Sequence, residues 1–166
     1  MTEATQSWVE ERALDRRVVV VWTVQEAIGY AVLALAALAV DIGARMAGAD
    51  VPGPPGLAAG LLAVAGGVAA WWLPRARHRH WRYQVAADAL ELRHGILKRV
   101  HSAIPYFRVQ HIDVAQGPVE RAAGLARLIV HTASAGTDAT IPGVTAGDAE
   151  GLRRLILSRA GSGDAV

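Results

Sequence analysis

The sequence of 166 residues contains no cysteine, which excludes disulfide bonds, a thiolate nucleophile and metal sites with cysteine ligands. It has a single lysine, Lys98, so arginine supplies the rest of the 17 basic side chains. The formal net charge is only +2, too small by itself to indicate binding to nucleic acid. The positions of the basic residues are therefore more informative than their number.

Hydrophobic residues are abundant at 52%, above the roughly 45–50% of a soluble domain. The run Val18–Val40 would form a helix of about 34 Å, enough to cross a hydrocarbon core of about 30 Å. The run Leu57–Leu73 would extend about 26 Å, near the short end of the membrane-spanning range. We therefore predict a hairpin of transmembrane helices, 18–40 and 57–73, joined by a short external loop, 41–56.

Arginine is distributed unevenly around these two runs. The residues before the first run include Arg12, Arg16 and Arg17, whereas the loop between the runs contains only Arg45. Because arginine and lysine accumulate on the cytoplasmic side, we predict a multi-pass protein of the cell membrane with both termini cytoplasmic. A signal peptide is the alternative, but the first run is too long for an apolar signal core.

A basic juxtamembrane linker is expected at residues 74–82, after the second run. Arginine next to tryptophan could bind nucleic acid. Beside a membrane helix, however, these arginines are better placed to contact anionic lipid, and each basic residue near the leaflet contributes about 1 kcal/mol of attraction. The predicted membrane-interface residues are Trp71, Trp72, Arg75, Arg77, Arg79, Trp81 and Arg82.

Glu26 is a carboxylate inside the first apolar run, which makes it a candidate functional residue. It lies about two turns from the predicted cytoplasmic end, where it could pair with Arg75 or Arg77. A structural role is therefore favoured over a functional one.

Glycine spacing in the second run would permit close helix packing. Gly56 and Gly60 form a Gly-x-x-x-Gly motif, and Gly66 and Gly67 are adjacent. The motif is compatible with packing within the hairpin and also with dimerisation. The sequence does not choose between them and leaves a homo-oligomer open.

The second half of the chain is predicted to be rich in β-structure. Apolar residues alternate with polar ones along 90–93 and again from Ile96 to Ile104, as in half-buried strands. His94-Gly95 indicates a hairpin turn, and Pro105 is expected to end the second of these strands. Further strands are expected at 83–85, 109–114, 128–130 and 139–141, with breaks at Gly117-Pro118 and Pro142-Gly143.

A C-terminal helix is predicted after the strands. Thr145 is suited to cap its N-terminus, and Asp148 places an acid in its first turn. The apolar residues at helical spacing are Ala149, Leu152, Leu155 and Ile156. The helix should end near Gly161, which leaves a domain at 83–160 and a disordered tail at 161–166.

Several motifs in this half resemble the bacterial PH-domain family, the YdbS-like membrane proteins. They are the stretch 90–97, the pattern Pro-x-x-Arg-x-Gln-x-x-Asp-Val at 105–114, and the stretch 116–121. The resemblance extends over roughly 18–160. It implies a membrane hairpin followed by a pleckstrin-homology-like β-barrel closed by a C-terminal α-helix, tethered to the inner face of a bacterial membrane. It implies no established reaction. The motif residues, expected to be structural, are Pro105, Arg108, Gln110, His111, Asp113, Gly117 and Pro118.

Histidines invite a metal interpretation, but their spacing argues against it. His78 and His80 lie among arginines, where a cation would bind poorly. The other candidates, His101, His111 and His131, fall on three different predicted strands, and neither cysteine nor a carboxylate cluster completes a site. No metal and no cofactor are therefore expected.

His111 and Asp113 are the nearest approach to catalytic chemistry. At i and i+2 on one strand they share a face, as an acid–base pair requires. The sequence offers no nucleophile in register with them, so we expect Arg108 and Asp113 to stabilise the turn by a charge-assisted bond. We accordingly predict that the protein is not an enzyme.

The function favoured by the sequence is a non-catalytic protein-interaction or scaffolding module at the inner leaflet. The expected partners are the phospholipid membrane and a membrane or cytoplasmic protein, not nucleic acid. Exposed sheet edges and the groove beside the C-terminal helix are the expected docking surfaces. The alternative is a lipid-binding or lipid-sensing module that uses Lys98 and Arg99 on the third strand. An enzyme using Glu26, His111 or Asp113 and a transporter subunit are less favoured.

Overall fold

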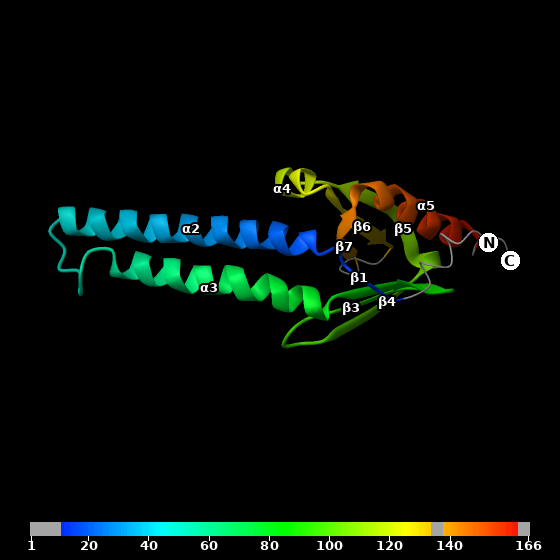
Figure 1. The fold of residues 1–166 in the computed structure, drawn as a ribbon, viewed down its shortest axis with the longest axis horizontal. Coiled ribbons are helices and arrows are strands. Elements are labelled where there is room, and N and C mark those ends of the chain that lie inside the picture. Colours follow the sequence, from blue (N-terminus) through cyan, green and yellow to red (C-terminus); the bar gives the residue numbers. More distant parts are fainter. Residues whose placement is uncertain (1–10, 134–137, 163–166) are drawn as a thin grey trace. The chain divides into compact units, whose positions relative to one another are not determined.

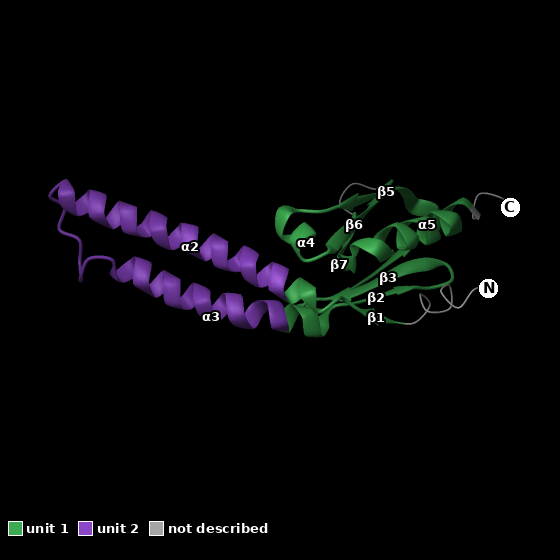
Figure 2. Ribbon diagram, turned by 45° about the horizontal axis from the view of Figure 1, so that its top comes forward, with its two compact units in different colours: residues 1–19, 76–166 green, residues 20–75 purple. Residues whose placement is uncertain are grey.

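The computed structural model describes residues 11–133 and 138–162. The chain divides into two compact units, drawn in different colours in Figure 2. One is the segment 20–75, which contains most of two long helices. The other combines residues 1–19 with residues 76–166 and contains every strand found among the described residues.

The two long helices, α2 (Arg17–Met46) and α3 (Leu57–His80), run side by side as an antiparallel hairpin (Figure 1). They contain 30 and 24 residues, which corresponds to about 45 and 36 Å. None of the most apolar stretch of α2 is buried, and only 17% of that of α3. Exposed apolar side chains cover both helices, among them Val32, Leu35, Val40, Leu61, Val64 and Val68. Both helices are long and apolar enough to cross a membrane.

Both helices extend beyond their predicted ends at residues 40 and 73. The helix α3 continues through Pro74 as far as His80, so most of the expected juxtamembrane linker is helical. A proline inside a helix removes one backbone donor. One turn before Arg75, the carbonyl oxygen of Trp71 accepts a hydrogen bond from the Arg75 guanidinium.

Asp41 connects the end of α2 with the start of α3. One of its carboxylate oxygens accepts a hydrogen bond from the backbone N–H of Gly56 at 2.8 Å, and the other pairs with Arg45 at 3.1 Å. Arg45 also donates to the carbonyl oxygen of Gly53 at 2.9 Å. Arg45, the one arginine of the predicted loop 41–56, therefore lies in the last turn of α2 and bonds to the segment that follows the helix.

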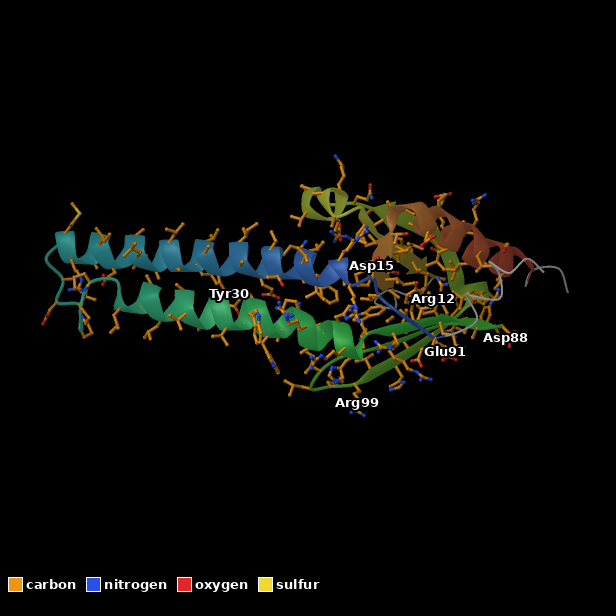
Figure 3. The ribbon with its side chains drawn as sticks, in the orientation of Figure 1. Arg12, Asp15, Tyr30, Asp88, Glu91 and Arg99 are labelled. Atoms are coloured by element: carbon orange, nitrogen blue, oxygen red, sulfur yellow. The ribbon has the colours of Figure 1, made fainter. Side chains whose placement is uncertain are left out.

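Gly66 is the point where α3 approaches α2 most tightly among its glycines. A Cβ atom at this position would lie 2.4 Å from the Cβ atom of Tyr30, the α2 residue labelled in Figure 3. By contrast, Gly60 and Gly67 have open space around them, and Gly56 lies before the helix with φ of +76°. Gly66 is thus the glycine that packing within the hairpin requires.

We expect Gly66→Ala to destabilise the hairpin by about 1–3 kcal/mol, because the added methyl group overlaps the root of the Tyr30 side chain. Gly67→Ala is the matched control, since alanine favours the helix and meets nothing there. Thermal unfolding of both variants in detergent, followed by circular dichroism, measures the difference. Equal stabilities would show that this contact does not form.

The other unit contains two antiparallel sheets. The first has the order β1-β2-β3-β4, and the second has the order β5-β6-β7. The strands of the first sheet are β1 (Arg12–Ala13), β2 (Arg82–Val85), β3 (Ala89–His94) and β4 (Val100–Pro105). Those of the second are β5 (Val109–Ala115), β6 (Leu125–Thr132) and β7 (Ala139–Thr145). A 3₁₀ turn, η1 (Tyr106–Arg108), connects them.

The expected barrel is not confirmed, because the described strands form two open sheets. Pro105 ends β4 as predicted, and η1 then interrupts the chain before β5, so that β4 and β5 belong to different sheets. The strand β4 is therefore an edge of the first sheet, and β7 is an edge of the second.

The C-terminal helix, α5 (Ala146–Ser162), packs against β5, β6, β7 and η1 (Figure 1). Thr145 caps it as expected, accepting the Asp148 N–H at 3.2 Å. The fully buried residues of α5 are Ala149, Leu152 and Ile156, on one helical face. They meet a core that includes Leu125, Leu128, Val130 and Ile141. Of the predicted tail, residues 163–166 lie outside the described part of the chain.

The segment before α2 belongs to the same unit as the sheets. The short strand β1 pairs with β2, with Arg12 opposite Tyr83. Leu14 and Val18 are buried, and the carbonyl oxygen of Leu14 is 3.0 Å from a ring nitrogen of His78. The domain is therefore discontinuous in sequence, and it starts well before the predicted boundary at residue 83.

Gly143 provides the room for this segment. The strand β7 does not end before Pro142-Gly143 as predicted, because these two residues form a bulge opposite Arg127. Gly143 has φ of +63°, and a Cβ atom there would lie 2.6 Å from the Cβ atom of Val18. Its carbonyl oxygen accepts the Asp15 N–H at 3.2 Å.

Gly143→Ala should lower the stability of the strand-containing unit by at least about 2 kcal/mol, because it adds both backbone strain and overlap with Val18. Gly147→Ala on α5 meets no atom within 4 Å and serves as the control. Denaturant unfolding of the full chain in detergent measures both. Unchanged stability in Gly143→Ala would contradict the packing of Val18 against the bulge.

Two further elements differ from the sequence prediction. The strand β4 starts at Val100, and residues 95–99 form the loop before it, so Lys98 and Arg99 are not on a strand as expected. A short helix, α4 (Pro118–Ala122), follows β5 where only a break was predicted.

Candidate functional site

Three surface features of the strand-containing unit could carry function. The first is a basic groove of about 250 Å³. It is lined by Glu11, Arg79, His80, Arg82, Arg93, His94, Gly95, Arg99, Val100 and His101. The lining contains four arginines and one acidic residue, Glu11. Arg93 forms an ion pair with Glu11 at 3.5 Å. The groove thus offers several donors to an anion.

The basic groove includes some of the residues predicted for membrane and lipid contact. Arg79, Arg82 and Arg99 line it, and Figure 3 labels Arg99 next to β4. Lys98 does not line it, but it is exposed in the same loop, beside Leu97, whose relative exposure is 101%. A fully exposed leucine next to two cations is a combination suited to an anionic membrane surface.

The loop before β4 depends on Gly95. Its φ is +108°, and a Cβ atom there would lie 1.9 Å from the carbonyl oxygen of Lys98. The predicted turn at His94-Gly95 is therefore present, with glycine required by both its dihedral angle and its surroundings.

The remaining predicted interface residues divide between the two units. Trp71 and Trp72 are 62% and 54% exposed on α3, and the guanidinium of Arg75 lies 4.9 Å from the Trp71 ring. Arg77 is exposed on the same helix. Trp81 follows α3, with its ring centroid 5.5 Å from that of His94.

Glu26 is half-buried on α2. It borders a depression in the hairpin together with Gln25, Gly29 and Tyr30. The carboxylate thus lies next to the polar side chain of Gln25, within a long apolar stretch of α2.

The second feature is a cleft of about 660 Å³ bordered by edge strands of the two sheets. Its residues on or near the first sheet are Trp81, Leu92, His94, His101, Ser102, Ala103 and Ile104. Those on or before β7 are Asp138, Ala139, Thr140 and Pro142. A docking groove was expected beside the C-terminal helix; a smaller hollow of about 390 Å³ there includes Asp148 in the first turn of that helix.

The third feature is a cluster of histidines and carboxylates. His111 on β5 lies directly opposite His131 on β6, and their rings stack with centroids 4.2 Å apart and planes 15° apart. Asp113 lies on the same face, 3.3 Å from His131 and 4.0 Å from His111. The sequence places His111 and His131 on different strands, as predicted, but the fold pairs these two strands with each other. His101 lies on β4, in the other sheet.

Asp138 completes the surroundings of His131. One carboxylate oxygen lies 3.0 Å from Nδ1 of His131, and the other accepts the Thr132 N–H at 3.0 Å. This backbone bond is the main reason that the pKa of Asp138 is below its usual value. The role of Asp138 was missed because nothing in its sequence spacing connects it with His131.

The remaining motif residues lie at strand ends, a bulge and a helix start, outside the histidine cluster. Arg108 does not pair with Asp113 in the described part of the chain; its guanidinium lies 5.7 Å from the Phe107 ring. Pro105 ends β4, and Gln110 is exposed at the bulge of β5.

Gly117 and Pro118 start α4. The Gly117 N–H donates to the carboxylate of Glu120 at 2.7 Å, and Pro118 is the first helical residue, where its missing donor is harmless. Glu120 is buried and pairs through the same oxygen with Arg127 at 2.8 Å. The family-like stretch 116–121 thus fixes a helix start.

Arg159 of α5 links the first sheet to η1. Its guanidinium donates to the carbonyl oxygens of Val85, at 3.1 Å, and Ala86. It lies 3.5 Å from the hydroxyl of Tyr106, which itself donates to Ala86 at 2.8 Å. Burial raises the pKa of Tyr106, so the phenol stays protonated and able to donate at neutral pH.

Comparison with known proteins agrees with the predicted resemblance. The sequence model of the family described as "Bacterial PH domain" matches residues 18–160. The "UPF0699 transmembrane protein YdbS" of Bacillus subtilis (strain 168) is 34% identical over 84 residues. The alignment covers 51% of this chain and 52% of that relative, so the chain spans about half the length of the curated relative. No solved structure matches the chain significantly.

Proposed function

The chain belongs to the bacterial PH-domain family and is a membrane protein, and from this we propose that its PH-like domain is a non-catalytic protein-interaction module at the inner leaflet. The observation that carries the proposal is the cleft bordered by two sheet edges. In this proposal the hairpin keeps the domain at the membrane, and the cleft receives an extended segment of a partner protein.

The discontinuous domain supports a hairpin with two membrane crossings. Residues 11–19 precede the hairpin and 76–162 follow it, yet they belong to one folded unit. Segments that fold together must lie on the same side of the membrane, so the chain crosses it an even number of times. The arginines on both flanks favour the cytoplasmic side.

The cleft has the properties that strand addition requires. The strands β4 and β7 each have one neighbour in their sheets, so each has an edge to which another strand could pair. Ser102, Thr140 and His101 add polar groups along the walls, and Leu92 and Ile104 add apolar surface. Backbone pairing would supply affinity, and these side chains would supply specificity.

A photo-crosslinking residue at Ala103, which is exposed on β4 and lines the cleft, should capture a protein partner in native membranes. The same residue at Arg154, exposed on α5, is the control and should not capture it. Mass spectrometry of the crosslinked peptide should identify an extended segment of that partner.

A second substitution distinguishes docking from chance proximity. Thr140→Trp should fill the β7 side of the cleft and abolish the crosslink from position 103 without changing the thermal stability. Equal crosslinking from positions 103 and 154, or a crosslink that survives Thr140→Trp, would overturn the docking proposal.

The alternative is a lipid-binding or lipid-sensing module, which the basic groove and the loop before it favour. Each cation near an anionic leaflet contributes about 1 kcal/mol, and Arg79, Arg82 and Arg99 could act together. The exposed Leu97 could enter the interface next to them.

Hydrogen exchange of the full chain in nanodiscs tests this alternative. Residues 95–101 should exchange more slowly in phosphatidylglycerol than in phosphatidylcholine, because anionic headgroups would order the loop and the groove. Arg99→Gln should remove most of the added protection, and Arg154→Gln, which changes an exposed arginine on α5, should not. Protection that is independent of lipid charge would exclude headgroup recognition by this groove.

A further inference from the structure

The histidine and carboxylate cluster is a group of polar side chains that neither the family resemblance nor the proposed docking cleft explains. We propose that His111, Asp113 and His131 bind one divalent transition-metal ion of the zinc type. The three residues present ligand atoms that all lie within 4.8 Å of one another, on one face of the pair β5 and β6. Two imidazoles and one carboxylate are a ligand set that zinc accepts.

His131 is the central ligand, because both of its ring nitrogens face carboxylates. Nδ1 lies 3.0 Å from Asp138, and Nε2 lies 3.3 Å from Asp113. A neutral imidazole has one N–H, so it can donate to only one of these two carboxylates. With the N–H directed to Asp138, the Nε2 lone pair faces Asp113, and a cation between them makes the contact favourable.

Asp138 has the role of the supporting carboxylate found behind many metal-binding histidines. It accepts from His131 through one oxygen, and its other oxygen is fixed by the Thr132 N–H at 3.0 Å. Such a partner selects the tautomer that leaves Nε2 free to bind the metal, and it orients the ring. This arrangement is more specific than an unordered group of surface charges.

Binding of the ion requires the ring of His111 to rotate, because it is stacked on His131 and the three ligand atoms are separated by up to 4.8 Å. Bonds to zinc of about 2.0–2.2 Å in tetrahedral geometry place the ligand atoms about 3.4 Å apart. The 3.3 Å separation of His131 and Asp113 is close to this value, and His111 would approach Asp113 from its present 4.0 Å. The side chain of His111 is 61% exposed, so it is free to rotate toward the ion.

The site as described has three protein ligands. The fourth position of a tetrahedral zinc ion would therefore be taken by water or by a ligand from solution. The exposed fractions of Asp113 and His111, 60% and 61%, leave an open path for entry. The ion would connect β5 with β6 and thereby add to the stability of the second sheet.

The direct test is titration of the full chain in detergent, without a histidine tag, with zinc by calorimetry and with cobalt by visible absorption. We expect one equivalent of zinc to bind and tetrahedral cobalt to give an intense d–d spectrum. His131→Ala and His111→Ala should each weaken zinc binding at least about tenfold. Asp138→Asn should weaken it about 10–100-fold while leaving all three ligands in place.

His101→Ala is the matched control, because it removes an exposed histidine on β4 that lies outside the cluster. Its zinc affinity should equal that of the unaltered chain, and circular dichroism should show that all variants are folded. The proposal is overturned if the unaltered chain binds no stoichiometric zinc, or if His101→Ala weakens binding as much as His131→Ala. Binding that is insensitive to His111→Ala and His131→Ala would likewise refute it.

Discussion

The close approach of Val18 to Gly143 is the constraint on which the rest of the strand-containing unit depends. It places the residues that lead into α2 inside the same domain as the chain that leaves α3. Leu14 and Val18 are buried there, and β1 adds a strand to the first sheet. The helical hairpin is therefore an insertion within one domain, with a covalent connection to it at each end.

Two arginines of α5 bond to backbone carbonyl groups of both sheets. Arg159 connects α5 with the end of β2 and with Tyr106, while Arg153 of the same helix donates to the Ile112 carbonyl oxygen at 3.1 Å. This arrangement buries the core under α5 and leaves the free edges of β4 and β7 bordering a cleft. Because the described strands do not close into a barrel, β4 and β7 each have only one strand neighbour.

Features that depend on local periodicity could be predicted from the sequence, whereas those that depend on pairing could not. The two apolar runs, the alternation along β3 and the cap at Thr145 each correspond to an element of the structure. The strand β1 has two residues and no periodicity. The histidine cluster depends on the register of β5 against β6, which composition does not encode. Pro142-Gly143 is predicted from the sequence to end the strand, whereas β7 continues through it, because proline and glycine occur in bulges as well as in turns.

The discontinuous domain also determines the order in which the protein can mature. During synthesis the β1 segment is made first, but β2, its pairing partner, follows only after both helices have been made. Until then Leu14 and Val18 have no core to enter, because the later parts of the chain that surround them, among them His78 and the bulge at Gly143, do not yet exist. Completion of the strand-containing unit can therefore occur only after both helices have been made, so the folded unit itself reports that the segments before α2 and after α3 have come together.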